Sequence, residues 1–120
     1  MSEITIIIND TPPSNNQFIG RNNRWNYQKL KTEWSLLMRS GIKSIPKEPI
    51  IKSKVHIHYT FPTRTRRDPD NSSGKLILDP LVQFGIIADD SFNNIDLVLT
   101  AGYKKGIKET RITITEESNG

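Results

Sequence analysis

The sequence predicts a single α+β domain in which two helices pack on a small mixed β-sheet, in the order β-α-β-α-β-β. Four segments have the alternation or the β-branched composition of strands, and two have the apolar spacing of helices. The chain has 120 residues and no internal repeat, and a chain of this length usually forms one hydrophobic core. We therefore expect one domain over residues 1–120, with 116–120 as a frayed tail.

Residues 4–8 are almost entirely isoleucine and predict the first strand, at the edge or in the centre of the sheet. Apolar residues occupy every second position of 55–61, which predicts a half-buried strand with His56 and His58 on its polar face. Residues 95–103 and 107–115 predict the last two strands. Between them, Lys104, Lys105 and Gly106 predict a hairpin turn in which the glycine supplies the positive φ.

The first helix is predicted over residues 26–40. Leu30, Trp34, Leu37 and Met38 fall on one face of that helix, the basic residues lie elsewhere around it, and Gly41 is the natural stop. This helix therefore has an apolar face for the core and a basic face for solvent.

The second helix is predicted to start after a Ser72 or Ser73 cap and to stop near Gly85. Pro80 removes a backbone hydrogen bond within it, so we expect a kink there or a split after Asp79. The preceding residues, 63–71, are polar, charged and interrupted by proline, and they predict an exposed loop.

Composition excludes several classes of protein. The chain has no cysteine, so it has no disulfide framework, no thiolate zinc site and no cysteine nucleophile. Its longest apolar runs are far shorter than the roughly 20 residues that span a bilayer, and its N-terminus lacks a signal-peptide pattern. We expect a cytoplasmic protein without membrane contact.

Charge is distributed unevenly along the chain. Residues 1–67 hold 12 basic and 4 acidic side chains, whereas residues 68–120 hold 5 basic and 9 acidic ones. This distribution suits a metal-dependent enzyme acting on a polyanion, because cations neutralise phosphates while carboxylates hold a divalent ion. The alternative is that the charges only solvate the surface.

Two acidic pairs are the candidate metal ligands. Asp68 and Asp70 flank a proline that favours extended backbone, so their side chains share a face and can hold one divalent ion or two. Asp89 and Asp90 form a second pair beyond the predicted second helix. Estimated lengths of helix and loop make closure within one chain just possible. Completion of the site by a partner subunit is the alternative.

Two further groups carry open interpretations. Lys75 lies among the aspartates and can stabilise charge on a scissile phosphate, or it can simply pair with Asp79 one helical turn away. His56 and His58 have no third zinc ligand at a matching spacing, so a solvated strand face that contacts phosphate is favoured over a zinc site.

The chain resembles the RusA-type Holliday junction resolvases, a small family common in phages and prophages. The resemblance covers nearly the whole chain, and together its markers are specific. They are Pro12-Pro13-Ser14-Asn15-Asn16, Arg66-Arg67-Asp68-Pro69-Asp70-Asn71, the helix with Lys75 and Ile77-Leu78-Asp79, and Gly85-Ile86-Ile87-Ala88-Asp89-Asp90 before a strand. The resemblance implies a homodimeric endonuclease that uses Mg²⁺, with Mn²⁺ as a possible substitute, to nick two opposed strands of a four-way DNA junction.

By position, Asp68, Asp70 and Asp90 resemble the essential carboxylates of the family, and Lys75 resembles its essential lysine. Our hypothesis for the mechanism is phosphodiester hydrolysis assisted by one or two metal ions, with Asp89 orienting a water and no small-molecule cofactor beyond the metal. Phosphate contacts are expected from a polar and basic set: Asn15, Asn16, Arg21, Arg24, Lys29, Arg64, Arg66 and Arg67.

Two other functions stay open at this point. The same basic surface suits a non-catalytic DNA- or RNA-binding module in which the aspartates serve as caps and turns. A metal nuclease acting on linear or branched duplex matches the aspartates and the lysine loosely.

Overall fold

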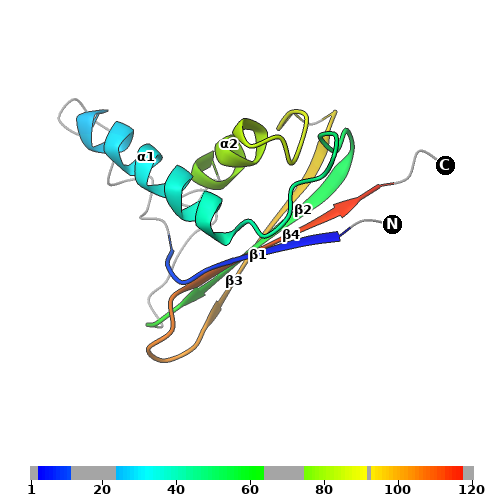
Figure 1. Cartoon of the computed structure of the whole chain (residues 1–120). Coiled ribbons are helices and arrows are strands. Elements are labelled where there is room, and N and C mark those ends of the chain that lie inside the picture. Colours follow the sequence, from blue (N-terminus) through cyan, green and yellow to red (C-terminus); the bar gives the residue numbers. More distant parts are fainter. Residues whose placement is uncertain (1–2, 12–23, 64–74, 92, 118–120) are drawn as a thin grey trace.

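The computed structural model describes residues 3–11, 24–63, 75–91 and 93–117. For residues 24–27 and 75 it describes the backbone alone. It confirms an α+β domain with two helices and one mixed four-stranded sheet, and both helices lie on the same face of that sheet (Figure 1). In chain order the elements are β1 (Glu3–Ile8), α1 (Arg24–Gly41), β2 (Ser53–Phe61), α2 (Lys75–Gln83), β3 (Ile95–Tyr103) and β4 (Glu109–Glu116).

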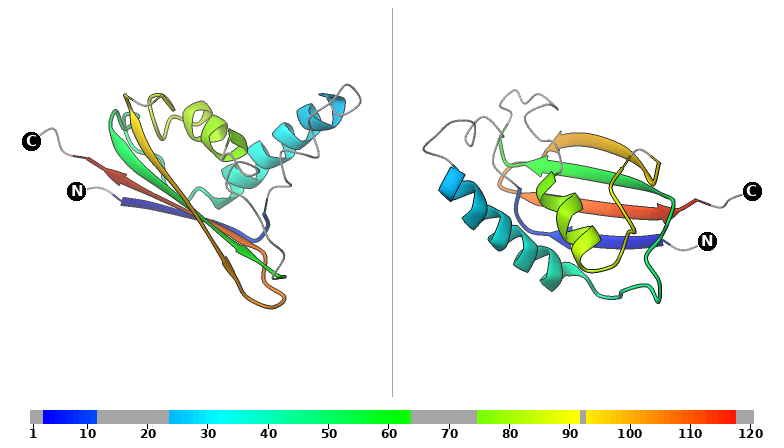
Figure 2. Two further views of the ribbon diagram at one scale, coloured as in Figure 1. Left: turned by 180° about the vertical axis from the view of Figure 1, so that it is seen from behind. Right: turned by 90° about the horizontal axis from the view of Figure 1, so that it is seen from above.

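The strands lie side by side in the order β1-β4-β2-β3 (Figure 2). β4 runs antiparallel to both of its neighbours, β1 and β2, whereas β2 and β3 are parallel. Parallel neighbours need a crossover connection, and α2 provides it. The parallel strands β2 and β3, which α2 connects, therefore form one half of the sheet. The antiparallel strands β1 and β4 form the other half.

The predicted hairpin between the last two strands is wrong. The turn itself exists, since Gly106 has a φ of 73° and Ile107 N donates to Lys104 O at 3.0 Å. β4, however, does not return beside β3 but passes β2 and inserts between β2 and β1. The physical reason is pairing: between β1 and β2, both edges of β4 are hydrogen-bonded to a neighbouring strand, and Ile112 and Ile114 are fully buried in the core.

The core lies between the helices and the covered face of the sheet. The predicted alternation of β2 is confirmed, because Val55, Ile57, Tyr59 and Phe61 are buried while the intervening residues are not. Isoleucines from β1 and β4 and residues from both helices complete this layer: Ile6, Ile8, Ile112, Ile114, Trp34, Met38, Leu76, Ile77, Leu78 and Leu81. The opposite face of the sheet is not covered by any described element (Figure 2).

α1 confirms the first predicted helix and places its apolar face as expected. Trp34 and Met38 are buried, and Leu30 and Leu37 pack against the core as partly buried residues. The helix ends where it approaches β1 closely: a Cβ at Gly41 would lie 3.1 Å from Ile6 Cγ2. Gly41 is the last residue of the helix, and its lack of a side chain allows this close contact.

α2 is continuous through Pro80, so the predicted split after Asp79 is wrong. Pro80 removes only one intrahelical hydrogen bond, and its own carbonyl still accepts from Phe84 N at 2.9 Å. Ile77 and Leu81, on either side of the proline, are both fully buried. Packing of these two side chains holds the second turn in place despite the missing bond.

The predicted frayed tail begins too early at Glu116. Glu116 is the last residue of β4, paired with Ser53, and Glu117 N donates to Lys52 O at 3.0 Å. The end of the sheet is therefore held by the backbone of the segment before β2. No helix within the described ranges is long and apolar enough to cross a membrane.

Candidate functional site

The loop that carries Asp89 and Asp90 begins where α2 ends, at a well-defined C-terminal turn. Gly85 has a φ of 76°, Gly85 N donates to Val82 O at 3.1 Å, and Ile86 N donates to Leu81 O at 2.9 Å. This pattern is a Schellman motif, and its usual apolar contact is present because Leu81 and Ile86 are both fully buried. The sequence thus turns the chain sharply at Gly85 and fixes its direction.

The chain is then anchored on both sides of the acidic pair. Ile87 forms a parallel bridge with Ile50, and Ala88 N donates to Ile50 O at 2.9 Å. After the pair, Ser91 Oγ donates to Asn94 Oδ1 at 2.8 Å, and Asn94 Nδ2 donates to Ile51 O at 2.8 Å. Asp89 and Asp90 therefore occupy a short segment whose two ends are hydrogen-bonded to Ile50 and Ile51, just before β2.

Both carboxylates of the pair face solvent. Asp89 Oδ1 accepts a hydrogen bond from Asp90 N at 2.8 Å, which fixes the orientation of the Asp89 side chain. Neither aspartate forms an ion pair with any residue in the described part of the chain. Their remaining oxygens are therefore free to accept from water or to ligate a hard cation such as Mg²⁺, which prefers carboxylate oxygens.

Only part of the predicted ligand set lies within the described residues. Asp68 and Asp70 lie outside the described residues, and of Lys75 only the backbone is described, as the first residue of α2. Within the described ranges, no group of three or more His, Asp or Glu side chains can hold a metal ion. Asp89 and Asp90 alone supply part of a site, and α2 separates them in sequence from the other two aspartates.

Of the predicted phosphate contacts, Lys29 is the one whose side chain is described, and it is exposed on α1. Arg24 begins α1, and only its backbone is described. The others, Asn15, Asn16, Arg21, Arg64, Arg66 and Arg67, lie outside the described residues. Lys29 and Arg39 form no ion pair within the described part of the chain, so these two cations of α1 are available to an external anion.

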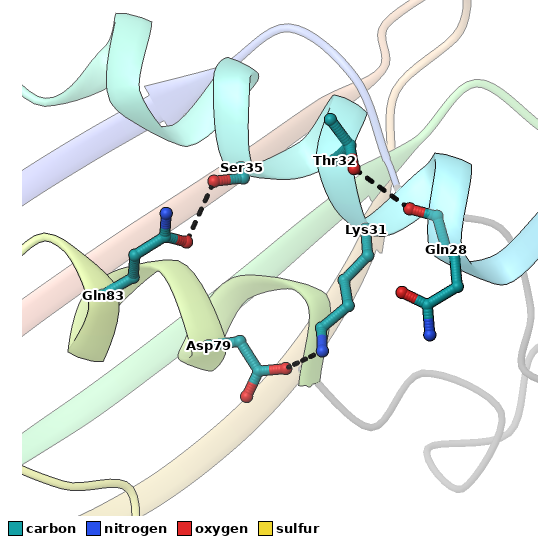
Figure 3. Close-up of polar contacts among 6 residues, drawn as sticks. All are labelled: Gln28, Lys31, Thr32, Ser35, Asp79 and Gln83. Atoms are coloured by element: carbon teal, nitrogen blue, oxygen red, sulfur yellow. Dashed lines mark hydrogen bonds and ion pairs between the residues drawn. The ribbon is translucent and has the colours of Figure 1, made fainter.

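The contacts between α1 and α2 were not anticipated from the sequence. Lys31 Nζ lies 3.7 Å from Asp79 Oδ2, and Ser35 Oγ donates to Gln83 Oε1 at 3.1 Å (Figure 3). Lys31 and Ser35 are one helical turn apart on α1, as are Asp79 and Gln83 on α2. The sequence does hold a signal for this contact, because each helix carries two polar residues four positions apart that can meet the two on the other helix.

A shallow groove of about 380 Å³ runs beside these contacts. It is lined by Gln28, Lys31, Thr32, Ser35, Leu36 and Gln83. Leu36 is 67% exposed, and most of the other lining side chains can donate or accept hydrogen bonds. The groove is open and its surface is mixed polar and apolar, so it is not the enclosed apolar pocket that small organic cofactors occupy.

In comparisons with known proteins, the chain matches no protein-family model and has no significant match among curated proteins.

Proposed function

We propose that the protein is a metal-dependent endonuclease that resolves four-way DNA junctions by paired, symmetric nicks, acting as a homodimer in the cytoplasm of a bacterial or phage-infected cell. The observation that carries this proposal is the acidic pair Asp89 and Asp90. Both side chains are exposed, have no cationic partner among the described residues, and lie on a segment anchored at both ends.

Several features support a catalytic role for this pair over a structural one. Caps and turns use a carboxylate to satisfy backbone N–H groups, and the Asp89–Asp90 contact satisfies only one such group. The carboxylate oxygens that this contact leaves unused face solvent, where an external cation can reach them. The oxygen donors of the pair therefore fit Mg²⁺ or Mn²⁺ as an incomplete ligand set that needs further carboxylates.

In the proposed mechanism, Asp68, Asp70 and Asp90 hold one or two divalent ions. When bound, such an ion acidifies water and neutralises negative charge that develops on the phosphate. Asp89, fixed by its hydrogen bond from Asp90 N, orients the attacking water. Lys75 stabilises the leaving oxygen, and Lys29 together with the arginines of residues 64–67 grips the flanking phosphates.

Selectivity for a junction over linear duplex follows from symmetry in this proposal. Phosphate contacts carry little base information, so shape must select the substrate. A two-fold dimer presents two equivalent sites with a fixed separation and direction to a two-fold junction. Completion of each metal site within one chain and completion across the dimer are both compatible with this scheme.

Cleavage of an end-labelled four-way junction tests the proposal, with the same sequence as linear duplex in parallel and with Mg²⁺ or EDTA. We expect symmetric, Mg²⁺-dependent nicks confined to the junction. Asp70→Asn and Asp90→Asn should each abolish these nicks while junction binding is kept or strengthened, because a charge that repels phosphate has been removed.

Asp96→Asn is the matched control, because Asp96 is an exposed aspartate at the start of β3 that has no place in the proposed site. This variant should cleave like the unmodified protein. Binding to several junctions without any cut, in Mg²⁺ and in Mn²⁺, would instead identify a non-catalytic nucleic-acid-binding module. Equal cleavage of junction and linear duplex would identify a less selective metal nuclease.

A further inference from the structure

Two histidines converge on one hydroxyl on the uncovered face of the sheet. His56 Nε2 and His58 Nδ1 of β2 each lie 2.7 Å from Thr100 Oγ1 of β3. The ring centroids are 6.3 Å apart, with an interplanar angle of 78°. Both side chains are half-buried, so the ring nitrogens are held in place but remain within reach of solvent.

The fold builds this arrangement from three positions. His56 and His58 alternate on the central strand and therefore point to the same face. The parallel register places Thr100 beside His58. Gly102 provides the room, because a Cβ at that position would lie 3.3 Å from His58 Nε2 and 3.5 Å from His58 Cε1.

The hydrogen-bonding chemistry of the cluster is asymmetric. A hydroxyl carries one hydrogen, so Thr100 can donate to only one of two neutral rings and must accept from the other. Each nitrogen nevertheless points toward the same point in space. Because both lie 2.7 Å from Oγ1, they are no more than about 5.4 Å apart. Two nitrogens on a tetrahedral zinc ion are about 3.4 Å apart, a separation that lies within this limit.

Neighbouring groups leave the other coordination positions open. In the sheet register, His56 lies between Thr113 and Val98, and His58 lies between Arg111 and Thr100. None of these neighbours is a carboxylate, and Arg111 is engaged by Glu109, with Nη2 3.4 Å from Oε1. The pair therefore offers two imidazole ligands, and water or an external ligand completes the shell.

We propose that His56 and His58 form a chelating pair that binds a divalent transition-metal ion on the uncovered face of the sheet. Imidazole nitrogen suits Zn²⁺, Ni²⁺ and Cu²⁺, with Cu²⁺ bound most tightly, and it does not suit Mg²⁺. This site is independent of the proposed nuclease centre, because that centre relies on carboxylates for a hard cation. Either site can fail experimentally without the other.

The composition of the chain excludes competing histidine and cysteine ligands from the test. The sequence holds two histidines and no cysteine, so no other imidazole or thiolate competes for the metal. Untagged protein is used, since a polyhistidine tag would bind the same ions. Zn²⁺ is titrated while the ¹⁵N-imidazole signals and the thermal unfolding midpoint are recorded, with Mg²⁺ as the parallel titrant.

We expect Zn²⁺ to shift the ring signals of both histidines and to raise the unfolding midpoint, because a ligand that binds only the native state stabilises it. His56→Asn and His58→Asn should each lose the midpoint shift, and Cu²⁺ should act at lower concentration than Zn²⁺. Thr100→Val is the matched variant that removes the hydroxyl and keeps both rings, so it should retain the Zn²⁺ response.

Three results would overturn the proposal. They are ring signals that do not move in excess Zn²⁺, an equal response to Mg²⁺, and an unchanged midpoint shift in the double variant His56→Asn/His58→Asn. Circular dichroism of each variant establishes that it is folded before metal is added.

Discussion

Tyr59 is the residue whose burial has the clearest energetic consequence. Its side chain is 2% exposed, and its hydroxyl has no hydrogen-bond partner within the described part of the chain. A buried polar group without a partner loses its hydration and gains nothing in return. The ring is well placed nonetheless, with the Phe61 ring centroid 6.0 Å away.

Tyr59→Phe should therefore stabilise the protein. The substitution keeps the ring and removes the unpartnered hydroxyl, so we expect the free energy of unfolding to rise by about 1 kcal/mol. Chemical denaturation of the two proteins under identical conditions measures the difference. A lower denaturation midpoint for Tyr59→Phe would mean that the hydroxyl makes a stabilising contact.

The same residue predicts a dependence on alkaline pH. Burial raises the pKa of Tyr59 from 10.0 to about 12. In the unfolded chain the phenol loses its proton near pH 10, while the folded state keeps it until about pH 12. The unfolding free energy should fall by about 1.4 kcal/mol for each pH unit between these values. Denaturation midpoints from pH 9 to 12 measure this fall, and Tyr59→Phe should remove this contribution from the total.

At the scale of single elements, the end of α2 determines where the acidic pair lies. Gly85→Ala places a Cβ on a left-handed residue, and no neighbouring atom crowds that position, so the cost is one of backbone conformation. We expect a loss of about 1 kcal/mol in stability and a marked loss of junction cleavage, because the Schellman motif fixes the direction of the segment with Asp89 and Asp90.

Gly106→Ala is the matched control for this prediction. Gly106 has nearly the same φ, and a Cβ there also meets nothing, but its turn connects β3 and β4 far along the chain from the acidic pair. It should lose similar stability and keep its cleavage rate. Equal cleavage by Gly85→Ala and Gly106→Ala would show that the placement of the acidic pair has no bearing on the reaction.

Elements were predictable from the sequence where the signal is local. Alternation in β2 and helical spacing around Trp34 depend only on neighbours in the chain, and both were confirmed. The position of β4 was not predictable in this way. The turn at Lys104 to Gly106 is a local feature, whereas the place of β4 depends on its pairing with β1 and β2, which are distant in sequence.

The candidate site was predictable in part. The sequence identified Asp89 and Asp90 as an acidic pair beyond the second helix, and the structure exposes both. The anchoring of that pair was not predictable, because the acceptors are the backbone carbonyls of Ile50 and Ile51, which leave no signal in the sequence. The hydroxyl of Thr100 between the two histidines likewise depends on the register of β2 and β3.

At the scale of the whole molecule, the proposed paired nicks require two copies of the chain. We expect light scattering to give twice the mass of the chain at the concentrations that support cleavage, both with and without junction DNA. Asp90→Asn should have the same mass if the loss of cleavage arises at the metal site. A protein that is monomeric throughout the active range would exclude paired nicking by a stable dimer.

The place of β4 also governs the order in which the sheet can assemble. β2, α2 and β3 are consecutive in sequence and can associate as soon as they have been synthesised. β1 is made first but has no neighbour in the sheet until β4 emerges, since its register runs from Glu3 opposite Thr115 to Ile8 opposite Thr110. A nascent chain that lacks β4 thus carries an isoleucine-rich strand with nothing to pair with, and this is the stage at which chaperone binding would matter most.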